Sequence, residues 1–172
     1  MCKVEGVAKY IVDKYRKDYG EDIEHMKLHK MLYFAQRESY IEYNKPLFEE
    51  SLYAGKHGPV VLEVRDLYVA HSFKRQIRHS VLESRKRVFE KLWKDYASSS
   101  TLTLRDISCE EISWKNAMDK KDNPVDGFYL IDNNDIKDDA LKIIERRKQL
   151  SQIPPHVSIN KRTKRMDKKS SL

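Results

Sequence analysis

The chain has 172 residues and a net charge of +7, with 40% hydrophobic residues, 35% charged residues, five glycines and five prolines. This length allows one domain with a hydrophobic core, and the scarcity of glycine and proline disfavours a turn-rich all-β sandwich and favours helices. No apolar run reaches the roughly 18 residues of a membrane-spanning helix, and Lys3, Glu5 and Lys9 argue against a signal peptide.

Two helices are expected in the first 40 residues. Apolar side chains recur at three- and four-residue steps over residues 4–15, which is typical of an amphipathic helix on a core, and Gly20 suits its end. A second helix is expected over about residues 23–40, with an apolar face that begins at Leu28. Three aromatic residues widen its apolar arc: Tyr33, Phe34 and Tyr40. A helix that is apolar over so much of its circumference is expected to lie at the centre of the fold.

The middle of the chain contains stronger turn signals. The segment 44–46, Asn-Lys-Pro, ends the second helix, and residues 47–55 are too short for another one. We expect a small strand or an extended loop there, around Leu52 and Tyr53. The dipeptide at 58–59, Gly-Pro, predicts the start of the next helix, because proline suits the first helical position.

Short apolar segments then alternate with polar loops. The spacing predicts a helix over about residues 82–96, two short helices around 104–108 and 114–118, and a brief strand at 128–131. A last helix follows, capped by Asn133 or Asn134, and its early aspartates and late basic residues match the helix dipole.

Most of the positive charge lies at the C-terminal end. Residues 146–172 carry nine basic side chains and one acidic one, a net charge of +8, which leaves −1 for residues 1–145. A near-neutral body gives no support to a basic groove within the fold. Because the prolines at 154–155 block a helix, residues 151–172 are predicted to form a flexible basic tail. Residues 1–150 are predicted to form one compact, mainly α helical bundle with at most a small β element.

The sequence contains no motif for catalysis or for a cofactor. It lacks a GxSxG nucleophile elbow and the GxGxxG and GxxxxGK[ST] phosphate loops. Cys2 and Cys109 stand alone, as expected of reduced thiols in a cytoplasmic protein. His25 and His29 lie one helical turn apart, but the glutamate of a HExxH motif and a third ligand are missing. Surface or helix-end histidines are therefore favoured over a metal site, and we predict no enzyme, no metal and no cofactor.

Tyrosines and one histidine are candidates for contact with a partner. Four tyrosines fit the helical stripes less well than the others, and tyrosine is enriched in binding hot spots: Tyr10, Tyr19, Tyr40 and Tyr43. His57 lies directly before the glycine and proline at 58–59, where its side chain either fixes the turn or contacts a partner.

The basic tail resembles nucleic-acid-binding arms in composition, because clustered lysine and arginine side chains release counterions from phosphates. The candidate residues for such a contact are Lys161, Arg162, Lys164, Arg165, Lys168 and Lys169.

Three ordered blocks of the sequence resemble one family. Residues 27–36, KLHKMLYFAQ, resemble the KLQKLLYYAQ helix of the Panacea domain family, the SocA-like antitoxins often found in bacterial and prophage genomes. Residues 45–50, KPLFEE, resemble the family's KPLFDE turn, and residues 54–61, AGKHGPVV, resemble its AWKYGPVV. Trp114 with Ala117 looks like the late PWxxA element.

Three positions depart from the family pattern. Gly55 stands where the family usually has tryptophan, His57 where it often has tyrosine, and Ser113 where it has proline.

The resemblance implies a compact, mainly helical antitoxin that neutralises a cognate toxin, encoded next to it, by direct protein contact. Family members meet very different toxins, so the toxin itself is not inferred. We predict that the contact uses Tyr33, Phe34, Tyr40, Tyr43, Phe48, Lys56 and His57. The alternative is a phage- or prophage-encoded regulatory protein that contacts nucleic acid through its basic tail.

Overall fold

The structure is a computed structural model that describes residues 2–122 and 124–152. Its helices are α1 (Val4–Tyr19), α2 (His25–Tyr43), α3 (Leu62–Val69), α4 (His79–Ser84), α5 (Lys86–Leu92), α6 (Thr101–Cys109), α7 (Ile112–Lys120) and α8 (Asn133–Ser151), with a π-helical segment, η1 (Trp93–Ala97). Three short strands, β1 (Tyr53–Gly55), β2 (Gly58–Val60) and β3 (Tyr129–Leu130), form one antiparallel sheet in the order β2-β1-β3. The prediction of a mainly α fold with a small β element is confirmed.

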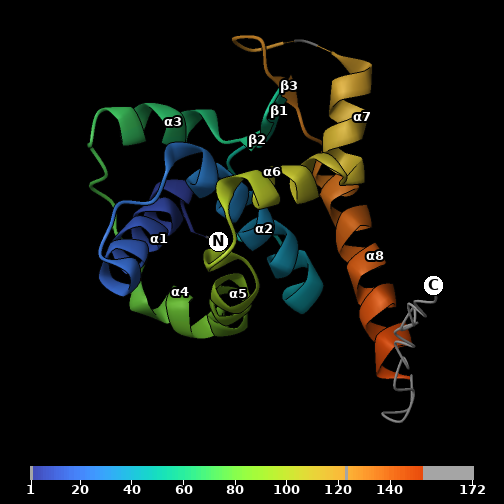
Figure 1. Ribbon diagram of the computed structural model, residues 1–172, viewed down its shortest axis with the longest axis horizontal. Coiled ribbons are helices and arrows are strands. Elements are labelled where there is room, and N and C mark those ends of the chain that lie inside the picture. The colour runs from blue at the N-terminus through green and yellow to red at the C-terminus, as the bar shows by residue number, and fades with distance from the viewer. Residues whose placement is uncertain (1, 123, 153–172) are drawn as a thin grey trace, which may run out of the picture.

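Helix α2 occupies the centre of the molecule (Figure 1). It contacts α1, α5, α6, α8 and strand β2, and every residue from Lys27 to Tyr40 is buried. The buried hydrophobic side chains form one cluster to which α1, α2, α5 and α8 all contribute. The prediction that the second helix is central is therefore confirmed.

The end of α1 and the start of α8 are each set by a capping residue. Helix α1 ends as predicted at Gly20, which takes the left-handed conformation (φ 73°) and donates its N–H to the Arg16 carbonyl. Helix α8 is capped by Asp132, whose carboxylate accepts the Asn134 N–H, so the predicted cap at Asn133 or Asn134 was placed one or two residues late.

The predicted helix start at residues 58–59 is wrong. Gly58 has a φ of 99°, which is incompatible with a helix, and Gly58–Val60 is strand β2, paired with β1. Pro59 is tolerated because β2 is an edge strand, where a missing N–H removes no ladder hydrogen bond. The two strands form a hairpin whose turn is Lys56–His57, and helix α3 begins only at Leu62.

The helix predicted over residues 82–96 is broken into α4, α5 and η1. The break lies at Arg85, whose backbone is not helical (φ −117°, ψ 17°) and whose guanidinium packs over the Tyr43 ring. Helix α4 buries no residue, whereas α5 buries Val88, Phe89 and Leu92. The apolar spacing continues across the break, so the sequence pattern did not show it.

Charge is unevenly distributed over the folded body. Residues 70–94 carry eight basic and two acidic side chains, a net charge of +6, whereas residues 95–145 carry six basic and twelve acidic ones, a net charge of −6. The near-zero total of residues 1–145 therefore hides two segments of opposite sign. We call the basic residues of the first segment the basic face. They lie on the connection before α4, between α4 and α5, on α5 and on η1, and they are Lys74, Arg75, Arg78, Arg85, Lys86, Arg87, Lys91 and Lys94.

Two sequence predictions concern the C-terminal end of the chain. Helix α8 continues through Ser151, one residue into the predicted tail, and the six candidate tail residues from Lys161 to Lys169 lie outside the described residues. Among the helices that the structure does describe, none has the length and apolar character needed to cross a membrane.

Candidate partner-binding face

Two buried residues of α2 form hydrogen bonds to the backbone of the β1–β2 hairpin and of the residue that follows it. The Val61 N–H donates to Nδ1 of His29 (3.3 Å), and Nζ of Lys30 donates to the Pro59 carbonyl oxygen (3.4 Å). Both side chains are fully buried. They therefore meet the backbone polar groups of β2 and of the segment just after it, where no helix or sheet partner is available.

His29 is a neutral hydrogen-bonding residue. Burial, followed by the neighbouring His25 and Lys30, lowers the pKa of His29 to about 3. Because its Nδ1 accepts from Val61, its hydrogen lies on Nε2, which is 2.8 Å from Nε2 of His25. The expectation of a surface or helix-end position fits His25, at the start of α2, and is wrong for His29.

Lys30 explains why a glycine follows the turn. A Cβ atom on Gly58 would lie 2.9 Å from Cε of Lys30 and 3.0 Å from Oγ of Ser108. Burial lowers the pKa of Lys30 to about 8, and within the described residues no carboxylate pairs with it. Gly58 is thus required by its positive φ and by its close approach to the Lys30 side chain.

A second glycine is covered by a distant aromatic ring. A Cβ atom on Gly55 would lie only 2.7 Å from the Phe128 ring, and Nε1 of Trp114 donates to the Gly55 carbonyl oxygen (3.0 Å). The Arg65 guanidinium lies 5.8 Å from the Phe128 ring centroid and pairs with Asp126 (3.2 Å). Side chains of α3, α7 and the segment before β3 therefore fix the outer side of the hairpin.

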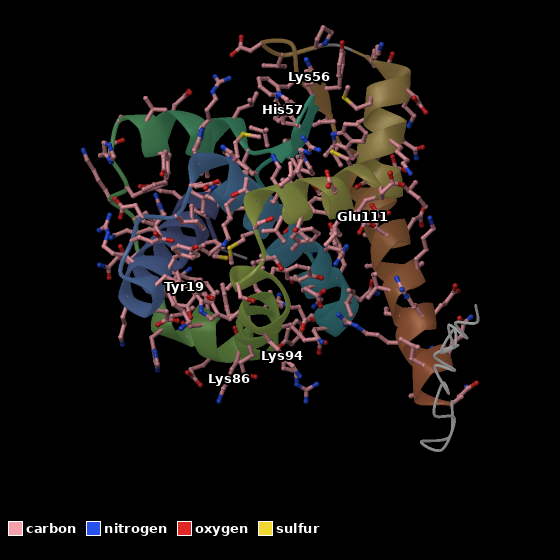
Figure 2. The ribbon with its side chains drawn as sticks, in the orientation of Figure 1. Tyr19, Lys56, His57, Lys86, Lys94 and Glu111 are labelled. Carbon is pink, nitrogen blue, oxygen red and sulfur yellow. The ribbon has the colours of Figure 1, made fainter. Side chains whose placement is uncertain are left out.

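Polar and apolar side chains are exposed on the hairpin and on the segment that leads into β3. Lys56 and His57 project from the hairpin turn at the top of the molecule in Figure 2. Two apolar side chains are exposed on and just before β3, which pairs with β1: Val125 is 45% exposed and Leu130 is 55% exposed. A hollow of about 630 Å³ adjoins both of these and is lined in part by Tyr53. We define the hairpin face as Lys56, His57, Val125, Phe128 and Leu130.

The other predicted contact residues lie in the interior. Tyr33, Phe34 and Phe48 are fully buried and Tyr40 is almost so, while Tyr43 is half-buried beneath Arg85. As folded, the buried side chains support the helices and present no surface to a partner.

Each of the buried aromatic residues has a structural partner. The Tyr33 hydroxyl donates to Asp139 (3.0 Å), and the Phe34 ring stacks on Tyr96 with centroids 4.3 Å apart. The Phe48 carbonyl oxygen accepts a hydrogen bond from Nε2 of Gln36 (3.0 Å).

One family model matches the chain. The model of the SocA-like antitoxins, Panacea domain, matches residues 28–115. The chain belongs to this family. Neither the curated proteins nor the solved structures contain a significant match to the chain. The match begins in α2, includes the β1–β2 hairpin and ends within α7, so the Panacea domain match stops before Val125, Phe128 and Leu130.

Most residues of the Panacea sequence blocks at the hairpin build the scaffold beneath the exposed surface. In the first block, Lys27 donates to the Tyr15 hydroxyl (3.1 Å), and Gln36 accepts the N–H groups of Leu47 and Phe48 through its Oε1 (2.9 and 3.2 Å). These bonds tie α2 to α1 and to the turn formed by the second block. Within the three blocks, the side chains that face solvent at the hairpin are Lys56 and His57.

Two departures from the Panacea pattern have a structural counterpart. The space that a side chain at Gly55 would take is filled by Phe128. Ser113, at the position of the family's proline, donates its backbone N–H to Oδ2 of Asp139 (3.0 Å), a bond that proline cannot make. Asp139 also accepts the Ile112 N–H (2.7 Å) and so caps the start of α7 from helix α8.

A buried ionic network was missed by the sequence analysis. Arg37 is only 2% exposed, donates to Glu111 and to the Tyr96 hydroxyl, and lies over the Phe34 ring. Burial outweighs the attraction of Arg37 and raises the pKa of Glu111 to about 7. Within the described residues, no group of three or more histidine, cysteine or acidic side chains is arranged to hold a metal ion.

Proposed function

We propose that this protein is an antitoxin that neutralises a cognate toxin by direct contact, in the cytoplasm and without catalysing a reaction. We further propose that the hairpin face is the contact surface. The observation that carries this proposal is the placement of the Panacea blocks. Their buried residues hold a hairpin with an exposed turn, Lys56–His57. Strand β1 of this hairpin pairs with β3, and two exposed apolar side chains, Val125 and Leu130, lie just before β3 and on it.

The support beneath the hairpin favours tight binding. Four contacts fix it: His29 to Val61, Lys30 to Pro59, Trp114 to Gly55, and Phe128 against Gly55. A surface held in its binding conformation loses little conformational entropy when a partner docks. A surface that carries both apolar side chains and a cation also matches the usual composition of protein interfaces, which have an apolar centre and a polar rim.

The composition of the hairpin face also offers a means of choosing one toxin. Lys56 and His57 lie inside the matched region, whereas Val125, Phe128 and Leu130 lie outside it. We propose that the segment from Val125 to Leu130 adapts the shared hairpin to a particular toxin.

The direct test of function uses the open reading frame next to this gene, which we propose encodes the toxin. Expressed alone it should arrest growth, and co-expression of this protein should restore growth. A harmless neighbour, or a toxic one that is not rescued, would contradict the proposal.

The contact surface is tested by two charge reversals. Lys56→Glu should weaken rescue and toxin binding by about tenfold or more, because it places a like or unpaired charge at the interface. Lys142→Glu makes the same charge change at an exposed position of α8 and is the matched control. Both variants should keep the melting temperature of the wild type. Equal binding by the two variants would show that Lys56 does not lie in the interface.

A further inference from the structure

We propose that the basic face binds the phosphate backbone of a nucleic-acid duplex. The part of this surface on α5 and η1 lies at the opposite end of the molecule from the hairpin turn: Lys86 and Lys94 project at the bottom in Figure 2, and Lys56 and His57 at the top. The proposal is independent of toxin binding. It also differs from nucleic-acid contact by the tail, because the charges belong to the folded body.

Only part of the positive charge of the basic face is neutralised by its surroundings. Lys91 makes one close pair, with Asp95 at 2.9 Å. The nearest carboxylates to Arg75, Lys86 and Arg87 are at 3.7, 3.7 and 3.9 Å. The remaining four members have no carboxylate within 4.0 Å among the described residues. An anionic ligand would therefore meet cations whose charge is still available.

The first part of the basic face is held in place by a backbone anchor. Residues 72–78 form neither helix nor strand, and the carboxylate of Glu5 accepts the backbone N–H groups of Lys74 (2.8 Å) and Arg75 (2.9 Å). The segment then crosses α1 at Gly6, where a Cβ atom would lie 3.2 Å from the Ile77 nitrogen. The anchor uses backbone groups of this segment, so the cationic side chains of Lys74 and Arg75 remain exposed.

The composition of the basic face favours nucleic acid over a protein or a membrane. Of the exposed large hydrophobic side chains in the described part of the chain, none lies between residues 70 and 94. Protein interfaces need apolar or aromatic anchors, and a membrane-binding helix needs an apolar face to insert. A surface of separated cations without such anchors is suited to phosphates, which are bound chiefly through charge.

The same surface favours a duplex over a single strand. Single-strand binding relies on exposed aromatic rings on which bases stack. The aromatic residues nearest the basic face are committed elsewhere. Phe89 is buried, and Phe73 and Tyr43 pack against the hydrophobic core. The Trp93 indole donates to Asp18 (2.8 Å) beneath the Lys14 ammonium. Backbone contacts alone position a protein on a duplex without reading its sequence.

The test measures binding of the full-length chain to a mixed-sequence DNA duplex by fluorescence anisotropy at several salt concentrations. The test variant reverses Lys86, Arg87 and Lys94 to glutamate, and the control variant reverses Lys45, Lys115 and Lys142, three exposed lysines outside the basic face, with a closely matched charge change. A third variant replaces the six candidate tail cations by glutamine. Phosphatidylserine vesicles serve as a second anionic probe.

We expect the test variant to bind the duplex at least about tenfold more weakly than the control variant, with a salt slope lower by about 1 for each lost phosphate contact. The tail variant should retain binding that depends on Lys86, Arg87 and Lys94. Three results would overturn the proposal: no duplex binding by the wild type at low salt, equal loss in the test and control variants, or binding of the vesicles and not of the duplex. Loss of toxin binding in the test variant with duplex binding unchanged would assign the basic face to a protein partner instead.

Discussion

The hairpin end and the basic end of the molecule place their polar residues in opposite ways. At the hairpin end, His29 and Lys30 are buried and satisfy backbone groups, and the outer surface is small and partly apolar. At the basic end, α4 buries no residue, and Lys86, Arg87 and Lys94, on α5 and η1, face solvent. The comparison shows that the family's polar residues on α2 serve the fold. We propose that partner choice depends on the exposed positions of the hairpin face.

The largest expected effect concerns the interior that both ends share. Arg37→Ala should lower the free energy of unfolding by about 3 to 5 kcal/mol, because Glu111 and Glu38 would lose their buried cation. Arg105→Ala removes an exposed pair with Asp106 and should cost less than about 1 kcal/mol. Urea unfolding of both variants measures the difference. Similar costs would show that the network does not hold α2 against α7.

Two glycines with positive φ test how firmly the hairpin end is anchored. Gly58→Ala meets Lys30 and Ser108 as well as an unfavourable φ of 99°, whereas Gly127→Ala has a φ of 78° and no atom within 4 Å of its Cβ. We expect Gly58→Ala to cost roughly 2 to 3 kcal/mol and Gly127→Ala only about 1 kcal/mol. Thermal or urea unfolding distinguishes them. Equal costs would mean that Lys30 does not press against the turn.

Acid should loosen the hairpin end through His29. Its folded pKa of about 3 lies below the ordinary value of 6.5, so the unfolded chain binds more protons between these two pH values. Stability from His29 is complete above pH 6.5 and falls as the pH falls, by about 2 kcal/mol at pH 5. The difference in unfolding free energy between pH 7 and pH 5 should shrink in His29→Asn. An unchanged difference would show that His29 does not carry this dependence.

Much of the fold follows from sequence periodicity, and the exceptions have physical causes. Helix α2 was predicted to be central because apolar residues cover most of its circumference, but the same breadth hid which aromatic side chains reach the surface. Tyr33 and Phe34 are neighbours in sequence and are both buried, because α1, α5, α6 and α8 surround the helix. Periodicity records one helix at a time and does not show how many others pack around it.

The missed parts of the site depend on contacts between distant residues. Arg37 and Glu111 are 74 positions apart, and Phe128 reaches Gly55 from a segment beyond the family match. The glycine and proline at 58–59 carry a local helix-start signal that strand pairing with β1 overrides. The basic face was hidden for another reason, since summing charge over residues 1–145 cancels +6 against −6.

A smaller effect separates two leucines with the same exposure. Leu130 on the hairpin face and Leu141 on α8 are each 55% exposed. Leu130→Lys should weaken binding of the toxin by about tenfold or more, as loss of an apolar contact at an interface does, while Leu141→Lys should leave it within about twofold. Neither change should shift the melting temperature by more than a few degrees, since both side chains are already half in solvent. Calorimetric titration gives both affinities. A larger loss of toxin affinity in Leu141→Lys than in Leu130→Lys would show that the interface lies on α8.

Hydrogen exchange of the toxin complex tests the central claim most directly, because it compares all surfaces of the full chain at once. The account predicts slowed exchange in residues 53–60 and 125–130 when the toxin is bound, with exchange in residues 74–94 unchanged. Slowed exchange in residues 74–94, with the hairpin amides as fast as in the free protein, would contradict it.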